Sequence, residues 1–309
     1  MDRWTQAARM MSSLGIPLVQ GLRMLVNGPS GQLVQIPEPD EDCVMEPGQN
    51  LRQTLDILAG KVPVSIPELP SRLDALMRPY QKEGFSFLYR ITERGFGACL
   101  ADDMGLGKTL QAIAWLDALR RKGRLEGLPA LIVAPASLLS NWKEEAQRFA
   151  PELILRIMHP SSPDPWQPEN TLRRKDCHAV ITTYGMAART SALADLHFPA
   201  IILDEAQAIK NAGSARSRAI RSLHGERRIA LSGTPVENNL NELWSLMEFL
   251  NPGLLGSRKS FESFTRSLER GYAPLRRLVR PFILRRMKTD PALVPDLPDK
   301  MEIPAYCSL

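Results

Sequence analysis

The segment DDMGLGKT, residues 102–109, carries the residue types that bind nucleotide phosphates. Its glycines allow backbone N–H groups to approach phosphate oxygens, its lysine can reach the β- and γ-phosphates, and its threonine hydroxyl can ligate magnesium. The strict pattern G-x-x-x-x-G-K-[ST] is not met, because Asp102 stands at the position of its first glycine. A glycine-rich turn can also be purely structural. The contacts predicted for a nucleotide in this segment are Gly105, Leu106, Gly107, Lys108, Thr109 and Leu110.

Asp204 and Glu205 form an acidic pair directly after the apolar run AIIL, residues 200–203. One carboxylate can hold magnesium through water, while its neighbour orients and deprotonates an attacking water. We assign Asp204 and Thr109 to magnesium. Glu205 is the predicted general base, so Lys108 and Glu205 are the predicted catalytic residues. Acidic residues at strand ends also cap helices, but after a phosphate-binding loop this pair favours nucleotide hydrolysis.

The segment LSGTPVENNLNELWSL, residues 231–246, also follows an apolar run. Thr234, Pro235 and Glu237 match a T-x-x-E capping box with proline at the first helical position, which explains them as a helix start. Capping does not require Ser232 and the turn that follows it. We therefore expect this segment to cap a helix and to act at the nucleotide as well.

Six short apolar runs must position these segments. Each has the length of a strand, and helical patterns alternate with them, as in LQAIAWLDAL at residues 110–119. The runs are FGACLA (96–101), ALIVAP (130–135), LILRIM (153–158), AVITTY (179–184), AIILDE (200–205) and RIALSG (228–233). Apolar strands alternating with helices predict an α/β fold with a parallel sheet of about six to seven strands, covered on both faces. Ligands of such sheets bind at the carboxyl ends of the strands, so the three segments should meet at one edge.

Composition limits the class of protein. The chain has 309 residues, of which 44% are hydrophobic, enough for one large core or for one core with a small accessory unit. No uncharged apolar run reaches the roughly 18 residues of a membrane span, so we expect a soluble protein without a membrane partner. The four cysteines lack the paired spacing of a metal site, which favours a reducing, cytoplasmic compartment. The net charge of +5 favours polyanions as partners, although solubility explains it equally well.

The three segments follow the order of motifs I, II and III in superfamily-two helicases. Their amino-acid sequences resemble those of the Swi/Snf-type ATPases. The resemblance covers about residues 76–300 and departs at Asp103, where glutamate is more usual. It is carried by DDMGLGKT, LIVAPASLLSNWKEE, ITTYGM, DEAQAIKN, LSGTPVENNLNELWSL and PFILRRMKTD.

The resemblance implies the first RecA-like lobe of a P-loop NTPase that uses ATP and Mg²⁺. Gln81, in MRPYQKEG, would contact adenine, although by itself it is typical of a helix surface. Ser232 and Thr234 would couple the nucleotide state to the grip on DNA. Together with the acidic pair, these residues would form an ATP-hydrolysing site.

Two further segments, SLLSNWKEE and TTY, would hold the phosphate backbone of one DNA strand, by the same resemblance. Such contacts position a nucleic acid without reading its sequence. Trp142 within the first of them fits a buried helical stripe. The predicted DNA-binding residues are Ser137, Asn141, Lys143, Thr182 and Thr183.

The chain is predicted to have three parts. Residues 1–70 would form an accessory segment with a linker, and residues 71–300 the lobe. A helical protrusion is expected at about residues 240–286, and residues 301–309 would begin the connection to a second RecA-like lobe whose signature is missing here. A basic cluster near the end of the protrusion can be a solvated face, a DNA contact or a brace between lobes. Its members are Arg276, Arg277, Arg280, Arg285, Arg286 and Lys288.

The implied function is the ATP-binding lobe of a DNA-dependent ATPase that translocates on double-stranded DNA and remodels protein–DNA complexes. In a prokaryote it would be associated with the nucleoid. The alternatives are an RNA or DNA strand-separating helicase and a non-catalytic, nucleotide-switched nucleic-acid-binding module.

Overall fold

Seven strands, all paired in parallel, form one sheet in the order β3-β4-β2-β5-β6-β1-β7. The computed structural model describes residues 65–162, 177–233, 240–267, 272–290 and 293. Within them the strands are β1 (Ala98–Leu100), β2 (Ala130–Ala134), β3 (Leu155–Met158), β4 (Ala179–Thr183), β5 (His197–Leu203), β6 (His224–Leu231) and β7 (Ile283–Leu284). The predicted parallel sheet is confirmed, since each of the six apolar runs contains or overlaps one strand.

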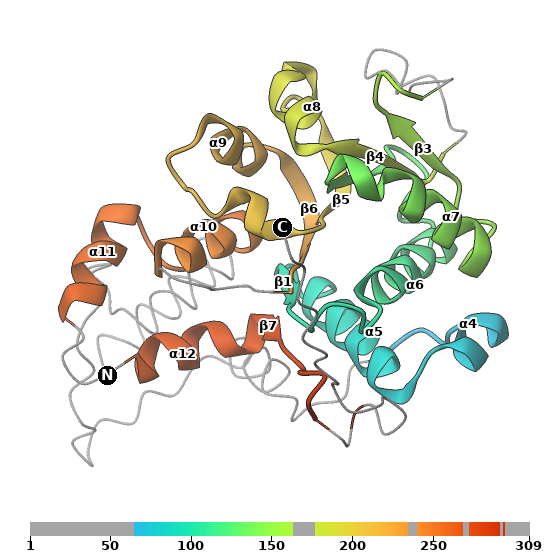
Figure 1. Cartoon of the computed structure of the whole chain (residues 1–309), viewed down its shortest axis with the longest axis horizontal. Coiled ribbons are helices and arrows are strands. Elements are labelled where there is room, and N and C mark those ends of the chain that lie inside the picture. Colours follow the sequence, from blue (N-terminus) through green and yellow to red (C-terminus); the bar gives the residue numbers. More distant parts are fainter. Residues whose placement is uncertain (1–64, 163–176, 234–239, 268–271, 291–292, 294–309) are drawn as a thin grey trace, which may run out of the picture.

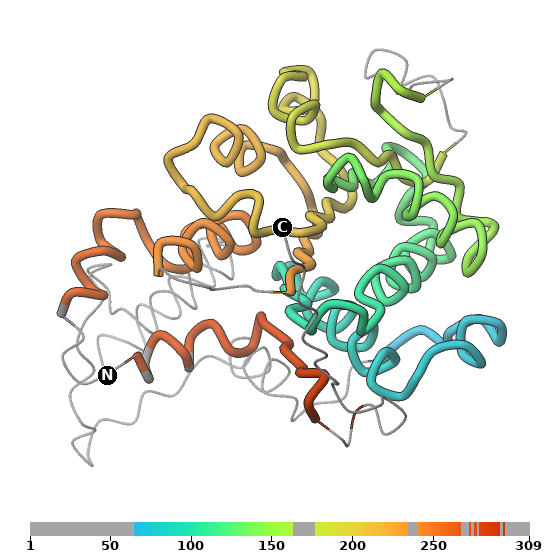
Figure 2. The backbone as a smooth tube through the Cα atoms, viewed as in Figure 1, coloured from blue at the N-terminus to red at the C-terminus, as the bar shows by residue number. Residues whose placement is uncertain are grey.

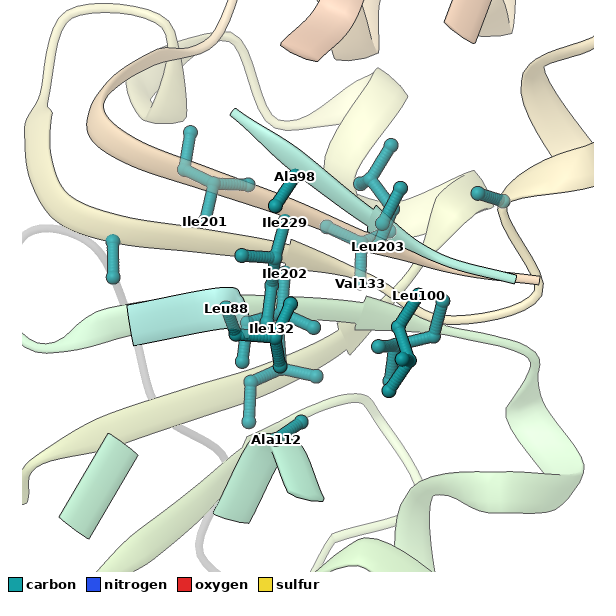
Figure 3. Packing of buried hydrophobic residues seen from close by; sticks show 14 of the residues in the cluster. Leu88, Ala98, Leu100, Ala112, Ile132, Val133, Ile201, Ile202, Leu203 and Ile229 are labelled. Atoms are coloured by element: carbon teal, nitrogen blue, oxygen red, sulfur yellow. The ribbon is translucent and has the colours of Figure 1, made fainter. Parts of the chain in front are cut away.

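The central strands form because their residues are apolar on both faces. Every residue of β1 and β2 is buried, and β-branched residues such as Ile132 and Val133 suit extended backbone. Figure 3 shows these side chains packed with Ile202 of β5 and Ile229 of β6. Burying one such side chain contributes roughly 1.5–3 kcal/mol, so a cluster of this size offsets much of the entropy lost when the chain becomes ordered.

Two layers of helices cover the sheet. Figure 1 shows α5, α6 and α7 together on one face and α8, α9 and α10 on the other. The bounds in the first layer are α4 (Ser71–Leu76), α5 (Pro79–Thr92), α6 (Lys108–Arg121) and α7 (Leu139–Phe149). Those in the second are α8 (Tyr184–Arg189), α9 (Ala215–Arg221) and α10 (Leu240–Leu250). None of the described helices combines the length and apolar character needed to cross a membrane.

The carboxyl ends of the strands bring the predicted segments to one edge. The chain runs from β1 through β2 to β3 and then returns through β4, β5 and β6, so right-handed crossovers place helices on both faces. In the register of the sheet, Leu100 of β1 pairs with Leu231 of β6, and Ala230 pairs with Leu203 of β5. Residues 102–109, 204–207 and 232–233 therefore leave neighbouring strands at the same edge, as predicted.

The structure corrects the end of the predicted helical protrusion. α10, α11 (Arg258–Ser267) and α12 (Ala273–Val279) are helical as expected, but Ile283 and Leu284 form β7 beside β1. Figure 2 shows the orange-red chain after α12 passing beside the teal first strand before its red end continues beyond it. The backbone N–H of Ala101 donates to the Leu284 carbonyl at 2.7 Å. A two-residue strand is too short to leave an alternating pattern, so the sequence does not predict it.

Cys99 provides a test of the sheet. Its side chain is fully buried in β1, and burial raises the pKa of the thiol to about 12. Because the thiolate is the nucleophile, we expect negligible alkylation of Cys99 by iodoacetamide in the folded chain at about pH 8 and rapid alkylation in urea. Mass spectrometry of the digested protein measures both rates. Equal rates in the folded and unfolded chains would contradict a buried position in the sheet.

Candidate active site

The loop after β1 leads directly into α6. Gly105 and Gly107 have positive φ values of 83° and 75°, and Gly107 immediately precedes the first turn of the helix. A Cβ at position 107 would lie 2.4 Å from the Gln81 side-chain nitrogen, so glycine is required there. The loop therefore ends at the N-terminus of a 14-residue helix, whose unpaired N–H groups and dipole favour anions.

Lys108 is the first residue of α6 and is only 8% exposed. Its Nζ donates to the carbonyl oxygens of Asp102 at 2.7 Å and Asp103 at 3.3 Å. The ammonium group is thus held against the loop backbone, where it can also meet a phosphate. Thr109 follows in the first helical turn and is partly exposed. Both residues lie where the sequence predicts phosphate and magnesium contacts.

The side chains of Leu106 and Leu110 are buried. Leu106 is 2% exposed and packs with Tyr80, while Leu110 is 9% exposed and belongs to the main core. Because these side chains are buried, a nucleotide would contact the backbone of the two residues, and that contact stays a prediction. The Leu106 carbonyl is already engaged, because it accepts a hydrogen bond from Gln81 Nε2 at 3.2 Å.

Gln81 lies against the loop and not on an exposed helix face. Its side chain is 8% exposed, and its Oε1 accepts a hydrogen bond from the backbone N–H of Arg78 at 3.0 Å, which caps α5. Its Nε2 donates to Leu106 in the phosphate loop. The surface-glutamine alternative is therefore wrong, and the contact with adenine stays a prediction.

A buried ionic network joins the loop to the segment after β7. Arg286 is 8% exposed and donates through Nε and Nη2 to the two carboxylate oxygens of Asp102, at 2.9 Å and 2.5 Å. The same guanidinium donates to the Tyr80 carbonyl and to Gln111 Oε1, the latter at 2.9 Å. The interpretation of Arg286 as part of a solvated face is wrong, because the residue is buried and the fully buried Asp102 carboxylate requires a cation. Its contact with DNA or with a second lobe stays a prediction.

Lys288 from the same cluster also lies at the phosphate loop. Its backbone N–H donates to Asp103 Oδ2 at 3.0 Å. Its Nζ is so near Gly105 that a Cβ at that position would lie 2.9 Å from it. The segment after β7 therefore contacts the phosphate loop through Lys288, a contact that the sequence does not predict.

Asp204, at the end of β5, is held at both carboxylate oxygens. Oδ1 accepts from the backbone N–H of Glu205 at 2.9 Å, and Oδ2 accepts from Trp142 Nε1 at 2.7 Å. Burial raises the pKa of the Asp204 carboxyl, and the hydrogen bond from Trp142 opposes this rise. Each oxygen retains lone-pair capacity for a magnesium ion or its water.

Glu205 is connected to the segment after β6. It is the one non-glycine residue with positive φ in the described chain, at 49°. Its Oε2 accepts from Gln207 Nε2 at 2.5 Å, and Gln207 Oε1 accepts from the Ser232 hydroxyl at 3.0 Å. Ser232, predicted for coupling, is thus separated from the predicted base by one glutamine. Thr234, the other predicted coupling residue, lies outside the described residues.

The residues predicted to hold DNA divide into exposed and buried ones. Ser137, Asn141 and Lys143 are exposed at and just before the start of α7. Thr182 is fully buried, and its hydroxyl donates to a β3 carbonyl at 2.9 Å, so its predicted side-chain contact with a phosphate is wrong. Thr183 is partly exposed and caps α8 through its hydroxyl oxygen. Contact of the four accessible residues with DNA stays a prediction.

Two aromatic residues at the site are not predicted from the sequence. The helical stripe explains Trp142 as core alone, and it is 1% exposed, yet its indole N–H also donates to Asp204. The Tyr184 hydroxyl donates to the Asp204 carbonyl at 2.7 Å, and burial raises the pKa of this phenol well above its usual value. The available signal was the position of Tyr184 at the carboxyl end of an apolar run.

The donor set fits a magnesium nucleotide. Mg²⁺ is usually bound by one or two carboxylates and substrate phosphates, not by a cage of protein ligands. In the part of the chain that the structure describes, no three His, Cys, Asp or Glu side chains gather to hold a metal alone. The buried Asp204 carboxylate, the Thr109 hydroxyl and the phosphate loop supply ligands of the kinds that such an ion uses.

Comparisons with known proteins agree with this arrangement. The chain matches the SNF2-related domain over residues 80–309. YwqA of Bacillus subtilis (strain 168), whose name describes an ATP-dependent helicase or translocase, is 45% identical over 233 residues, or 73% of this chain and 25% of YwqA. The chromatin-remodeling ATPase INO80 of Pyricularia oryzae is 36% identical over 88% of this chain and 14% of its own length.

A solved structure covers the same region. The Sulfolobus solfataricus SWI2/SNF2 ATPase core in complex with dsDNA has a TM-score of 0.68 and 41% identity, over 80% of this chain and 52% of that one. This chain thus spans about half of the solved core and a quarter or less of the curated relatives. With a RecA-like sheet, a phosphate loop and an acidic pair at one edge, and a family match over residues 80–309, this chain belongs to the SNF2-related family.

Proposed function

We propose that this chain is the ATP-binding lobe of a DNA-dependent ATPase that moves along double-stranded DNA and remodels protein–DNA complexes. The observation that carries the proposal is the hydrogen-bonded line from Ser232 through Gln207 to Glu205. Asp204 lies close enough to both Glu205 and Lys108 to interact with them electrostatically. A turn with a purely structural role would need neither a buried lysine nor an oriented acidic pair.

The residues divide the chemistry of ATP hydrolysis among them. Lys108 and the loop N–H groups would bind the β- and γ-phosphates, while Thr109 and Asp204 would hold a magnesium ion, which would neutralise charge on the phosphate oxygens. Glu205 accepts a proton from the attacking water as general base. The hydrogen bond from Gln207 orients that carboxylate, and Ser232 fixes Gln207 in turn.

The partners of the lobe are duplex DNA and a second RecA-like lobe. The relative solved with dsDNA supports the first partner, and the exposed Asn141 and Lys143 suit a phosphate backbone. The length of that core, about twice the matched part, supports the second. The second lobe would supply the arginine that stabilises charge on the transferred phosphoryl group.

The proposal is tested by binding and hydrolysis in one preparation. The chain should bind Mg-ATP, and it should bind duplex DNA more tightly than single strands or RNA of equal length, with affinity that falls steeply as salt rises. Hydrolysis should remain slow with or without duplex DNA, since an arginine from the second lobe is worth ~10³ to 10⁵ in turnover. Fluorescence anisotropy and phosphate release measure these quantities.

A Glu205→Gln variant is the control for contaminating ATPase, because it lowers hydrolysis at this site by about 10² to 10⁴ and leaves a contaminant unchanged. Binding to RNA alone would refute the proposal in favour of an RNA helicase. Strong stimulation by duplex DNA that disappears in Glu205→Gln would instead refute the need for a second lobe.

A further inference from the structure

Two hydrogen bonds from aromatic side chains meet at Asp204. Trp142 Nε1 donates to Asp204 Oδ2 at 2.7 Å, and the Tyr184 hydroxyl donates to the Asp204 backbone carbonyl at 2.7 Å. Both aromatic side chains are buried. Asp204, which directly follows β5, is therefore held by hydrogen bonds from two helices, α7 and α8.

Each aromatic residue belongs to a segment with a predicted DNA contact. Trp142 lies in α7 between the exposed Asn141 and Lys143. Tyr184 is the first residue of α8 and directly follows Thr183, which caps that helix. If a phosphate backbone bound to either segment displaced its helix, the displacement would change the position of a hydrogen-bond donor to Asp204.

The two hydrogen bonds hold different parts of the acidic pair. The bond from Trp142 sets the rotation of the Asp204 carboxylate, whose other oxygen accepts from the Glu205 N–H at 2.9 Å. A hydrogen bond to a buried carboxylate is among the stronger ones in proteins, so its loss frees that rotation.

The bond from Tyr184 reaches the carbonyl of the peptide unit that joins Asp204 to Glu205. That peptide precedes the left-handed backbone of Glu205, at φ 49°. A non-glycine residue keeps such a conformation only where its surroundings hold it. A change in the orientation of this peptide would therefore move the Glu205 side chain.

We propose that Trp142 and Tyr184 are positioning residues that transmit contact with DNA to the magnesium-holding and general-base carboxylates. The inference rests on the proposed function, because it takes the roles of the acidic pair and the DNA-contacting segments from it. Coupling between two binding sites is reciprocal, so bound Mg-nucleotide must change the affinity for duplex DNA through the same two hydrogen bonds.

The test measures this coupling directly. The Kd for a fluorescent duplex is determined by anisotropy with and without saturating Mg-ATPγS, and the ratio of the two constants is the coupling. We expect a ratio of about fivefold or more in either direction for the unaltered chain. In Trp142→Phe and in Tyr184→Phe the ratio should fall towards one, while the Kd without nucleotide changes by less than about twofold, because no DNA-facing group is removed.

The chain offers matched controls. Trp115 is fully buried, and its Nε1 donates to Thr92 Oγ1 at 3.0 Å, away from Asp204. Tyr89 is 1% exposed, and its hydroxyl accepts from Lys122. Trp115→Phe and Tyr89→Phe therefore remove the same atoms from buried positions and should keep the coupling of the unaltered chain. Thermal melts of all five proteins separate loss of stability from loss of coupling.

Tyr184→Phe removes a single oxygen atom and keeps the ring, so it tests the inference even if Trp142→Phe does not fold. Full coupling in a folded Tyr184→Phe would overturn the role of that residue, and full coupling in both variants would overturn the whole inference. The whole inference is also overturned if the control variants lose coupling equally, or if the unaltered chain binds both ligands without coupling. Failure of the unaltered chain to bind duplex DNA or Mg-ATPγS would refute the proposed function itself, and the inference with it.

Discussion

Replacing Lys108 with alanine is expected to weaken the binding of Mg-ATP by about 10² to 10⁴-fold, because two charge-assisted hydrogen bonds of about 1.5–3 kcal/mol each are lost at the phosphates. The Lys108 side chain is buried at the start of α6, and its Nζ already lies at the loop that would hold the triphosphate. Titration with a fluorescent ATP analogue in the presence of magnesium measures the change.

Glu205→Gln should behave differently, since that side chain acts on water and not on the nucleotide. Binding should stay within a few-fold of the unaltered chain, whereas hydrolysis in a complex with both lobes should fall by about 10² to 10⁴, the usual contribution of a general base. Lys122→Ala, just beyond the other end of α6, is the control for loss of a lysine from this helix. Equal loss of affinity in Lys108→Ala and Glu205→Gln would show that the division of roles is wrong.

Replacing Arg286 with alanine is expected to lower the free energy of unfolding by about 3–5 kcal/mol, the usual cost of removing one partner from a buried ion pair. The variant leaves the Asp102 carboxylate fully buried without its guanidinium, next to the phosphate loop. Urea unfolding followed by circular dichroism measures the loss. Nucleotide affinity should fall as well, because Asp102 anchors the start of the loop.

Two comparisons distinguish this cause from a general loss of packing. Arg258 pairs with Glu262 at 2.8 Å on an exposed face, so Arg258→Ala should cost less than about 1 kcal/mol. Adding Asp102→Asn to Arg286→Ala should recover part of the lost stability, because no unpaired charge then remains buried. Simple additivity of the two substitutions would show that the ion pair is not the source of the effect.

The positions of the sheet and of the phosphate loop follow from local properties of the sequence. A run such as ALIVA is apolar on both faces and must be buried on both. Alternation with helices makes the strands parallel, so motifs that follow different strands lie at one edge of the sheet. Gly105 and Gly107 mark a backbone that other residues adopt only with strain. Lys108, Asp204, Glu205 and Ser232 could therefore be placed at one edge from the sequence.

The tertiary structure alone decided how these groups are held. Arg286 reaches Asp102 across 184 positions of the chain, and Trp142 reaches Asp204 across 62. Local periodicity cannot show such pairs, because a buried arginine looks like any basic residue of a charged cluster until its partner is known. A buried indole ring can still donate one hydrogen bond through its N–H. The helical stripe that predicts Trp142 as a core residue therefore does not reveal its hydrogen bond to Asp204. The sequence thus determined which chemical groups meet, and long-range packing determined which neighbours orient them.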